Sequence, residues 1–303
     1  MSFHHVAVIG LGLIGGSIGL AVREHLPGVK TSGYDIDPQV RRRAAQRALA
    51  DRICDNPIEA VAEADLVILC VPVGAMGDAA REIAPGLSPY AVVSDVGSSK
   101  QAIGKALADA LPGRLVIPAH PVAGTEHSGP DAGFATLFHH RWCIVTPPEG
   151  ADPAKVADLV RFWQALGAMV DTMDAAHHDL VLAVTSHIPH LIAYTIVGTA
   201  SDLEEVTRGE VIKYSAGGFR DFTRIAASDP TMWRDIFLAN KEAVLEILGR
   251  FTEDLQALSR AIRWEEGDKL HELFTRTREI RRGVIALGQE SPEPNFGRDR
   301  GKH

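Results

Sequence analysis

The sequence predicts an α/β protein in which an N-terminal doubly wound parallel sheet is followed by an all-α C-terminal domain. Short apolar runs alternate with helical patterns up to residue 173, after which strand signals stop and long helical periodicities begin. Strands that alternate with helices are typical of a parallel sheet covered by helices on both faces. We therefore expect one domain over residues 1–173, a helical domain over 174–288 and a flexible, turn-rich tail over 289–303.

The expected strands of the first domain are short apolar runs. The third, LVILCV, is apolar throughout, which is typical of a strand buried on both faces. Helical patterns occupy residues 38–50 and 100–111, and a helix over 153–166 and a strand over Met169–Thr172 are expected to close the domain. The six main strands are predicted over Val6–Ile9, Thr31–Asp35, Leu66–Val71, Ala91–Asp95, Leu115–Ala119 and Trp142–Thr146.

The second half carries helix signals. Asp229 followed by Pro230 is a favourable helix start, because Asp caps free N–H groups and proline suits the first helical position. Apolar residues spaced by three and four positions run from Val244 to Ile262 and then from Leu270 to Leu287. These seams fit either the core of a bundle within one chain or contact with a second copy. Because two long helices make only a thin bundle, we favour a homodimer formed through this domain.

A glycine-rich motif directly follows the first strand. Residues 10–15, GLGLIG, match GxGxxG and open a helical stretch. Such glycines permit a tight turn, close approach of the backbone to a pyrophosphate and close packing of helix on strand. The alternative is a glycine-rich turn in a fold that binds flavin or nothing. We expect a Rossmann-type fold that binds a dinucleotide at a helix N-terminus, with contacts from Gly10, Gly12, Leu13, Ile14 and Gly15.

An acidic residue follows the motif at the expected distance. Asp35 ends the second predicted strand, 20 residues after Gly15. A carboxylate there accepts hydrogen bonds from the adenosine ribose and repels a 2′-phosphate, which favours NAD over NADP. The nearby basic run Arg41–Arg43 leaves NADP as an open alternative, although we expect these side chains on a solvated helix face.

Three later strand ends carry candidate site residues, because ligands of doubly wound sheets bind outside the carboxyl ends of the strands. Val71 and Pro72 after the third strand, and Gly97 after the fourth, are expected to flank the cofactor. His120 ends the fifth, where an imidazole can accept a proton from a substrate hydroxyl while hydride leaves the same carbon. The alternative is a structural histidine before a proline turn, but the position favours catalysis.

The helical half contains a second polar cluster. Ser186 and His190 lie in the segment SHIPH, and Arg224 ends the segment GGFRDFTR. A guanidinium can bind both oxygens of a carboxylate, so Arg224 is the expected partner of an anionic substrate. The alternative is an ordinary ion pair on a helix surface with Asp221 or Asp229.

The composition argues against several classes of function. A net charge of −8 disfavours nucleic acid as a partner, because duplex binding requires clustered Lys and Arg. Three scattered cysteines indicate free thiols in a reducing compartment. The uncharged run from Val6 to Val22 holds five glycines and is preceded by histidines but by no Lys or Arg, unlike a signal peptide. No other stretch reaches the ~18 uninterrupted apolar residues of a membrane span, so we expect a cytoplasmic protein that binds no membrane.

Metal binding is not expected. The chain has 13 histidines, but neither HExxH nor another metal-ligand spacing occurs. The adjacent pairs His139-His140 and His177-His178 are expected to face water.

Six sequence blocks, taken in order through both halves, resemble the prephenate/arogenate dehydrogenase family. HPVAGTEHSG (120–129) and GGFRDFTRIA (217–226) are far more specific than the glycine motif. The resemblance implies NAD-dependent oxidative decarboxylation of prephenate to 4-hydroxyphenylpyruvate, or of arogenate to tyrosine, in tyrosine biosynthesis. The other blocks are GLGLIGGS (10–17), SDVGSSK (94–100), TSHIPH (185–190) and DPTMWRDIF (229–237).

The resemblance also implies roles for individual residues. His120 would hydrogen-bond the ring 4-hydroxyl and take its proton, while Ser98 would support that hydroxyl and the nicotinamide. Arg224 would hold the ring carboxylate, and Trp233 matches a family aromatic without an assigned role. Further positions that match substrate-contacting or pocket-ordering positions are Ser186, His190, Thr125, Glu126 and Asp221.

Two other interpretations share parts of this pattern. A β-hydroxyacid dehydrogenase or imine reductase would have the same architecture, but such enzymes rely on a lysine of the helical domain near the active site. Lys213 is the only lysine between Met173 and Asn240, and it lies outside the motif cluster. A non-catalytic NAD-responsive regulator would be expected to have lost His120 or Arg224, and both are present. Prephenate and arogenate, which differ in a keto or an amino group, both stay candidate substrates.

Overall fold

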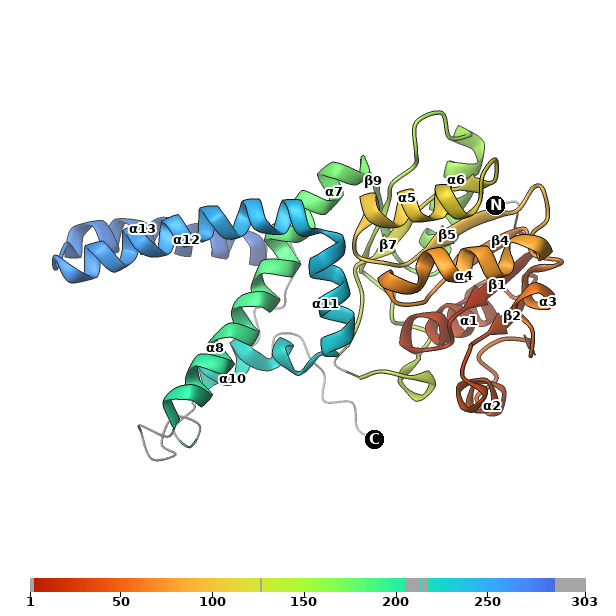
Figure 1. The fold of residues 1–303 in the computed structure, drawn as a ribbon, viewed down its shortest axis with the longest axis horizontal. Helices are drawn as coiled ribbons and strands as arrows, with labels where there is room; N and C mark the ends of the chain where they lie inside the picture. Colours follow the sequence, from red (N-terminus) through yellow and green to blue (C-terminus); the bar gives the residue numbers. More distant parts are fainter. Residues whose placement is uncertain (1–2, 126, 205–212, 214–216, 287–303) are drawn as a thin grey trace. The chain divides into compact units, whose positions relative to one another are not determined.

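The computed structural model describes residues 3–125, 127–204, 213 and 217–286. The chain forms two compact units, Met1–Leu245 and Glu246–His303, and each is described by itself. The first unit holds two sheets and the helices from α1 to α11, coloured red to cyan in Figure 1. The described part of the second unit is formed by long helices. The predicted tail over 289–303 lies outside the described residues.

The main sheet has the strand order β3-β2-β1-β4-β5-β6, and all neighbouring strands are parallel. This is the order of a Rossmann fold, in which the winding reverses between β1 and β4. The predicted doubly wound sheet is therefore confirmed, although the two-residue β3 was not expected. The strands are β1 (His5–Ile9), β2 (Lys30–Tyr34), β3 (Arg52–Ile53), β4 (Leu66–Leu69), β5 (Val92–Asp95) and β6 (Leu115–Val116).

Alternate residues of the central strands face opposite layers of helices, as the two-residue period of a strand requires. Val6 and Val8 of β1 lie in a buried cluster with α1 and α6. Ala7 and Ile9 lie in a second buried cluster with α3, α4 and α5. The helices of this layered domain are α1 (Leu13–His25), α2 (Pro38–Gln46), α3 (Pro57–Val61), α4 (Met76–Ile83), α5 (Lys100–Ala110) and α6 (Pro153–Ala165), with short turns η1 (Val73–Ala75), η2 (Ala84–Gly86) and η3 (Pro130–Ala132) (Figure 1).

A second, three-stranded sheet corrects the sequence prediction. Its order is β7-β8-β9, with β7 (Ala119–Pro121) antiparallel to β8 (Trp142–Val145) and β8 parallel to β9 (Met169–Thr172). The predicted fifth strand, Leu115–Ala119, is divided between the two sheets because β6 ends at Val116. Pro118 follows, and a proline has no N–H with which to continue the ladder. His120 therefore does not end a strand of the main sheet; it is paired with Ile144 in the second sheet.

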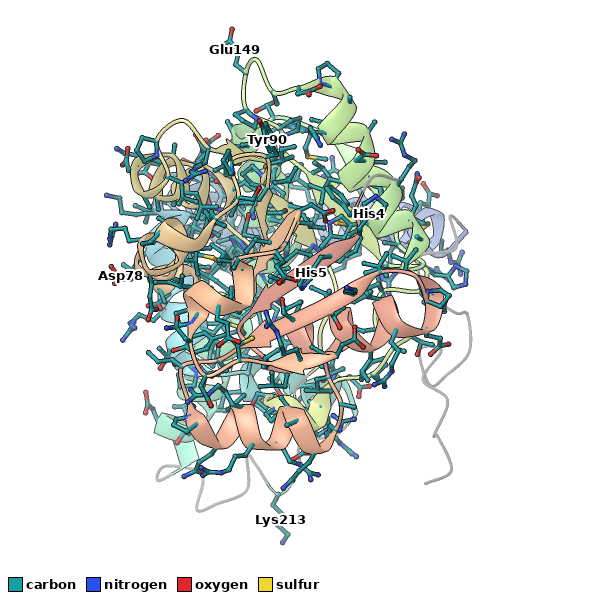
Figure 2. All side chains as sticks on the ribbon, turned by 90° about the vertical axis from the view of Figure 1, so that its right-hand side faces the viewer. His4, His5, Asp78, Tyr90, Glu149 and Lys213 are labelled. Atoms are coloured by element: carbon teal, nitrogen blue, oxygen red, sulfur yellow. The ribbon has the colours of Figure 1, made fainter. Side chains whose placement is uncertain are left out.

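Figure 2 labels one buried and one exposed polar side chain of the two sheets and their loops. His5 of β1 is buried, with its Nε2 2.9 Å from Ser32 Oγ of the neighbouring strand. Glu149, in the loop after β8, points outward from the molecule and is exposed. Short polar pairs such as His5 and Ser32 allow a buried strand to carry a polar side chain.

The helical part of the first unit begins with α7 (Ala175–Leu182), which a π-helical turn, η4 (Ala183–His187), joins to α8 (Ile188–Glu204). α10 (Gly217–Thr223), the 3₁₀ turn η5 (Arg224–Ala227) and α11 (Pro230–Ala239) follow. The predicted helix start is confirmed, because the Asp229 carboxylate accepts the N–H of Met232 at 2.8 Å and Pro230 is the first helical residue. The stretch Ala175–Leu203 is by length and composition apolar enough to cross a membrane, and 28% of its apolar window is buried.

Two long helices carry the predicted seams. α12 (Lys241–Arg263) starts at the end of the first unit, and α13 (Gly267–Ala286) belongs to the second. Leu255 and Ile262 of α12 and Ile280 of α13 are large apolar side chains that stay exposed. The seams are therefore only partly covered within the described residues, and Leu287 lies outside them.

Candidate active site

The N-terminus of α1 has the geometry of a phosphate-binding turn. Gly10 has a φ of +98°, and a methyl group on it would lie 2.4 Å from the Cys70 carbonyl oxygen, so glycine is required. A methyl group on Gly15 would lie 1.9 Å from the Gly10 carbonyl oxygen, so glycine also allows the close approach of helix and turn. Gly12 is the N-cap, with open space beside it and no capping side chain. A pyrophosphate fits here, against the first helical residues Leu13, Ile14 and Gly15.

Asp35 directly follows β2 and is held against the glycine turn. Its Oδ2 accepts the N–H of Leu11 at 2.8 Å, and its Oδ1 accepts the N–H of Asp37 at 3.0 Å. These bonds fix the carboxylate beside the turn, where an adenosine ribose is expected. The position of Asp35 thus fits a dinucleotide whose ribose carries free hydroxyls.

Arg41 is not on a solvated face, which corrects the expectation for the first residue of the basic run. Its guanidinium donates to the Asp35 carbonyl oxygen at 2.8 Å and pairs with Asp55 at 3.1 Å. It also lies 5.5 Å from the centre of the Tyr34 ring. Arg42 and Arg43 are exposed as expected. Arg41 is therefore engaged by its own chain beside the ribose position.

The loops after β4 and β5 border the glycine turn. A methyl group on Gly10 would lie 3.2 Å from Val71 Cγ1, so Val71 contacts the turn. Pro72 is exposed and is the N-cap of η1, which contacts α11 of the helical part. Gly97 is buried, and its N–H donates to Asp95 Oδ2 at 2.8 Å. The structure therefore brings Val71 to the phosphate turn, while Gly97 shapes the turn after β5.

His120 is buried at the start of a chain of hydrogen bonds. Its Nδ1 lies 2.9 Å from Nε2 of His178 in α7, and Nδ1 of His178 lies 2.8 Å from Oδ1 of Asp179. Burial, then the neighbouring His178 and Lys100, lower the pKa of His120 well below 6.5, so its imidazole is neutral at pH 7. Its Nε2 has no hydrogen-bond partner among the described residues. A neutral imidazole with one such nitrogen can accept a proton from a ligand.

The N-terminus of α5 is capped by a residue of the helical half. Asp179 Oδ1 accepts the N–H of Lys100 at 2.6 Å, and Oδ2 accepts the N–H of Gln101 at 2.9 Å. Ser99 occupies the N-cap position but makes no capping bond, and its buried hydroxyl has no partner within the described chain. Ser98 is only half-buried. Ser99 is thus a second candidate hydroxyl, adjacent to the predicted Ser98.

A buried lysine ties the end of β5 to the strand that carries His120. The Lys100 ammonium donates to the Asp95 carboxylate and to the Ala119 carbonyl oxygen, the latter at 2.7 Å. Burial lowers the pKa of Lys100, against the opposing effect of Asp95. Because Ala119 immediately precedes His120 in β7, this hydrogen bond restrains the backbone that carries the His120 imidazole.

The π-helical turn between α7 and α8 contains Ser186 and His187, and such turns are frequent at functional sites. His187 is buried, and its Nδ1 accepts a hydrogen bond from Asn240 Nδ2 at 3.0 Å. Its Nε2 has no partner in the part of the chain that the structure describes. Burial lowers the pKa of His187 to about 4. A neutral N–H donor is therefore available here to a ligand or a water.

His190 lies one turn further along the chain. Its Nδ1 donates to the Ser186 carbonyl oxygen at 2.8 Å, and its ring stacks on the Trp233 indole with centroids 3.6 Å apart. Trp233 of α11 is buried. The aromatic residue whose role the sequence left open therefore orients His190.

The other predicted substrate residues are exposed. Arg224 begins η5, and its charge helps to lower the pKa of His190 after the larger effect of burial, so the two groups are within electrostatic reach. Thr125 Oγ1 accepts the N–H of His127 at 3.2 Å. Asp221 is exposed in α10, and Glu126 lies outside the described residues.

Electrostatic couplings connect His120 to Arg224 in steps. His187 is among the groups that lower the pKa of His120, and His190 is among those that lower the pKa of His187. Arg224 acts in the same way on His190. Three imidazoles and the guanidinium, which the sequence presented as separate motifs, are therefore electrostatically coupled one to the next.

The expectation that His178 faces water is wrong. His178 is fully buried and hydrogen-bonded on both nitrogens, whereas its neighbour His177 is exposed. The signal in the sequence was the adjacent His178-Asp179 pair at the start of a helix, two groups that are costly to bury unless each is hydrogen-bonded. Among the residues that the structure describes, no group of three His, Cys, Asp or Glu side chains could hold a metal ion.

Hydride transfer to a dinucleotide needs a cofactor turn and one proton acceptor, so the fold and the site define a nicotinamide-dependent dehydrogenase. Two family models match the chain. The model described as prephenate dehydrogenase, nucleotide-binding domain, covers residues 18–172, and that described as prephenate dehydrogenase, dimerization domain, covers residues 174–276. The chain belongs to the prephenate dehydrogenase family, as the sequence blocks predicted.

Relatives and solved structures agree with this assignment. The chain is 46% identical to cyclohexadienyl dehydrogenase of Zymomonas mobilis over 92% of its length and 95% of the relative's. It is 33% identical to prephenate dehydrogenase of Bacillus subtilis, over 96% of this chain and 78% of the relative. The fold matches Aquifex aeolicus prephenate dehydrogenase in complex with hydroxyphenyl propionate and NAD+ at a TM-score of 0.88 and 33% identity, covering 94% of this chain and 99% of that one.

Family membership decides against the two alternative interpretations. The helical-domain lysine that a β-hydroxyacid dehydrogenase or imine reductase would need is not supplied by Lys213, which is exposed and points outward in Figure 2. The relatives are named as dehydrogenases rather than regulators.

Proposed function

We propose that this enzyme catalyses the NAD-dependent oxidative decarboxylation of prephenate to 4-hydroxyphenylpyruvate, of arogenate to tyrosine, or of both. The single observation that carries the proposal is the buried, neutral His120 with an acceptor nitrogen left over. Support comes from the names of the relatives, which specify prephenate or the cyclohexadienyl ring that prephenate and arogenate share.

The reaction requires little from the protein because its product is aromatic. NAD, when bound, would supply the acceptor for the hydride that leaves C4 of the ring. The bond between C1 and its carboxylate breaks, carbon dioxide leaves, and the bonding electron pair completes the aromatic ring. His120 takes the proton of the 4-hydroxyl and returns it to the phenol oxygen, so no net proton is released. Alignment of C4 with the cofactor and one reversible proton acceptor are therefore sufficient, without a metal.

The proposed substrate-binding residues fall into groups, according to the part of the substrate that each recognises. His120 and a serine hydroxyl, Ser98 or Ser99, address the ring hydroxyl. Arg224 binds the ring carboxylate, for which a guanidinium is suited because it donates two parallel hydrogen bonds. The residues assigned to the side chain of the substrate or to the order of the pocket are Ser186, His190, Thr125, Glu126 and Asp221.

NAD is the proposed cofactor in preference to NADP. The Asp35 carboxylate lies beside the phosphate turn, and Arg41 is already paired with Asp55 and the Asp35 carbonyl. A 2′-phosphate would meet the carboxylate and gain no free guanidinium from Arg41. Replacing Asp35 by alanine should raise the KM for NAD by about 10-fold, as expected for the loss of hydrogen bonds to a charged group. An unchanged KM for NAD would contradict this role.

Steady-state assays of the purified chain test the function directly. Prephenate and arogenate would each be supplied with NAD and with NADP, and reduced nicotinamide and carbon dioxide would be measured together. We expect one carbon dioxide per NADH with at least one of the two substrates. A β-hydroxyacid such as 3-hydroxyisobutyrate serves as the control and should not be oxidised. Oxidation of the hydroxyacid alone would overturn the proposal.

We further propose a homodimer formed through the helical domain, with the boundary between domains near residue 173. The description of the matched C-terminal model as a dimerization domain supports this, as do the exposed Leu255, Ile262 and Ile280. Light scattering of the wild-type chain and of Ile262→Glu would test it. We expect a dimer that the charged variant weakens, whereas the surface change Glu253→Gln has no effect. A monomeric wild-type chain would refute the dimer.

We also propose that the enzyme is soluble and cytoplasmic. The apolar stretch Ala175–Leu203 includes Asp179 and His187, whose buried side chains accept hydrogen bonds from α5 and from Asn240. A bilayer would remove those partners at a large energetic cost. The apolar surface of this stretch is instead assigned to contact between subunits. Recovery of the expressed chain in the membrane fraction would contradict this proposal.

A further inference from the structure

Two buried residues extend the hydrogen bond of His120 into the protein interior. His120 Nδ1 lies 2.9 Å from His178 Nε2, and His178 Nδ1 lies 2.8 Å from Asp179 Oδ1. The three side chains are at most 8% exposed. They come from β7 and α7, which are 58 residues apart in the sequence at the bond between the two imidazoles.

The order of these groups determines where the protons lie. An ionised carboxylate only accepts hydrogen bonds, so His178 Nδ1 must carry a proton. Burial is the largest cause of a lowered pKa for His178, so its ring is neutral and its Nε2 is an acceptor. His120 must then donate from Nδ1, which leaves its own Nε2 without a proton. The charge on Asp179 therefore selects the basic tautomer of His120 across an intervening imidazole.

We propose that His178 and Asp179 are positioning residues that hold His120 in this tautomer and stabilise the imidazolium formed when it takes the substrate proton. The proposal rests on the proposed function in one respect, the assignment of His120 as the proton acceptor. Because His120 returns its proton to the phenol oxygen, the hydrogen-bonded series His120–His178–Asp179 does not have to release a proton to solvent. The burial of Asp179 at the end of this series is consistent with that.

The surroundings of Asp179 keep it charged. Burial acts to raise its pKa, but hydrogen bonds from His178 and from the N–H groups of Gln101 and Lys100 outweigh burial and lower it. The N–H groups belong to the first turn of α5, where the helix dipole also favours a negative charge. Asn240 donates to the Asp179 carbonyl oxygen at 2.8 Å and restrains the backbone from the α11 side.

A double-mutant comparison tests whether His178 acts through His120. His178→Gln should lower kcat by about 100-fold in the wild-type background, as for other residues that orient a reacting imidazole. In the His120→Ala background the same change should lower kcat by less than about 3-fold, because the group it orients is absent. His177→Gln, on the exposed neighbouring position, is the matched control and should leave kcat unchanged.

Asp179→Asn provides a second, independent test. The amide can donate to His178 Nδ1 and reverse the proton order, so kcat should fall by about 100-fold or more while the Kd for NAD stays within about 3-fold. The acidic limb of the kcat/KM profile should also move to lower pH, because the imidazolium loses a stabilising charge. The titratable groups that act on His120 directly are His178, Lys100 and His187, and Cys143 adjoins it in the second sheet. Asp95 and Asp179 act on these neighbours.

The outcomes separate this proposal from the proposed function. If His120→Ala keeps full turnover, the assignment of the proton acceptor fails. If His120→Ala is inactive but His178→Gln and Asp179→Asn are fully active, only the positioning role fails. Equal losses from His178→Gln in both backgrounds would show an independent role, and loss of NAD binding in both positioning variants would show a merely structural one. Either result would overturn the proposal.

Discussion

His120 and Arg224 serve the same proposed substrate from opposite surroundings. His120 is buried and joined to His178 and Asp179, which are themselves buried. Arg224 is exposed at the start of a short turn. Burial can fix one tautomer of a base, because each ring nitrogen meets a defined partner. Exposure keeps a guanidinium accessible to an anion that arrives from water. The comparison suggests that the proton-transfer end is rigid and that the carboxylate-binding end receives the substrate.

The largest expected effect concerns the rigid end. His120→Ala should lower kcat by about 10³-fold, within the range for loss of a general base. The Kd for NAD, measured by titration, should be unchanged because the phosphate turn belongs to α1. His177→Ala is the control on a nearby exposed histidine. A fall in kcat of less than about 10-fold would remove His120 from proton transfer.

The next largest effect concerns the exposed end. Arg224→Ala should raise the KM for prephenate by about 50-fold with little change in kcat, because a charged hydrogen-bonding pair is lost from substrate binding. Arg224→Lys should give an intermediate KM, since lysine keeps the charge but not the paired donors. Arg220→Ala, an exposed arginine of α10, should leave KM unchanged. If Arg224→Ala lowers kcat instead, the contrast between the two ends is wrong.

A pH effect is expected at His187, which is electrostatically coupled to His120 and to His190. Its pKa is lowered from 6.5 to about 4, so the unfolded chain binds more protons within this window and stability falls as the pH drops below 6.5. Between pH 7 and pH 5 this group should remove about 2 kcal/mol from the free energy of unfolding. Urea unfolding at both pH values should show a smaller loss for His187→Gln than for the wild type. Equal losses would contradict the assignment.

The smallest effect distinguishes two adjacent serines. Ser99→Ala should lower kcat by about 5-fold, the loss of one ordinary hydrogen bond, because its buried hydroxyl has no partner within the described chain. Ser98→Ala should stay within about 2-fold of the wild type. The reverse result would restore Ser98, the position that the family resemblance implied.

The sequence was sufficient for the main sheet and insufficient for the second one. The glycine motif, the buried run of β4 and the cap at Asp229 are local signals, and each is present in the structure. The pairing of β7 with β8 is not local. An apolar run does not state which sheet it joins, and the break at Pro118 assigned His120 to a different sheet from the one predicted.

The same distinction applies to the site. His120, Arg224 and Asp35 could be proposed as site residues because they belong to motifs or follow predicted strands. The positioning role proposed for His178 and Asp179 could not be predicted, because it depends on contacts with distant residues, such as the hydrogen bond from the Lys100 N–H to Asp179 across 79 positions. Ser99 was not singled out, because the family resemblance implied its neighbour Ser98 and a serine before a helix is ordinarily taken for a cap. Only the structure reveals that another residue performs the capping.

The capping of α5 by Asp179 in place of Ser99 has a consequence for protein engineering. The first turn of α5 belongs to the nucleotide-binding half, yet its N–H groups depend on a carboxylate supplied by the other half. A fragment cut at residue 173 would lose this cap, at a cost of about 1 kcal/mol of helix stability. A chimera that imports a foreign helical half without an acid at position 179 would bear the same defect. Designers who exchange halves between relatives should therefore transfer Asp179 together with α5.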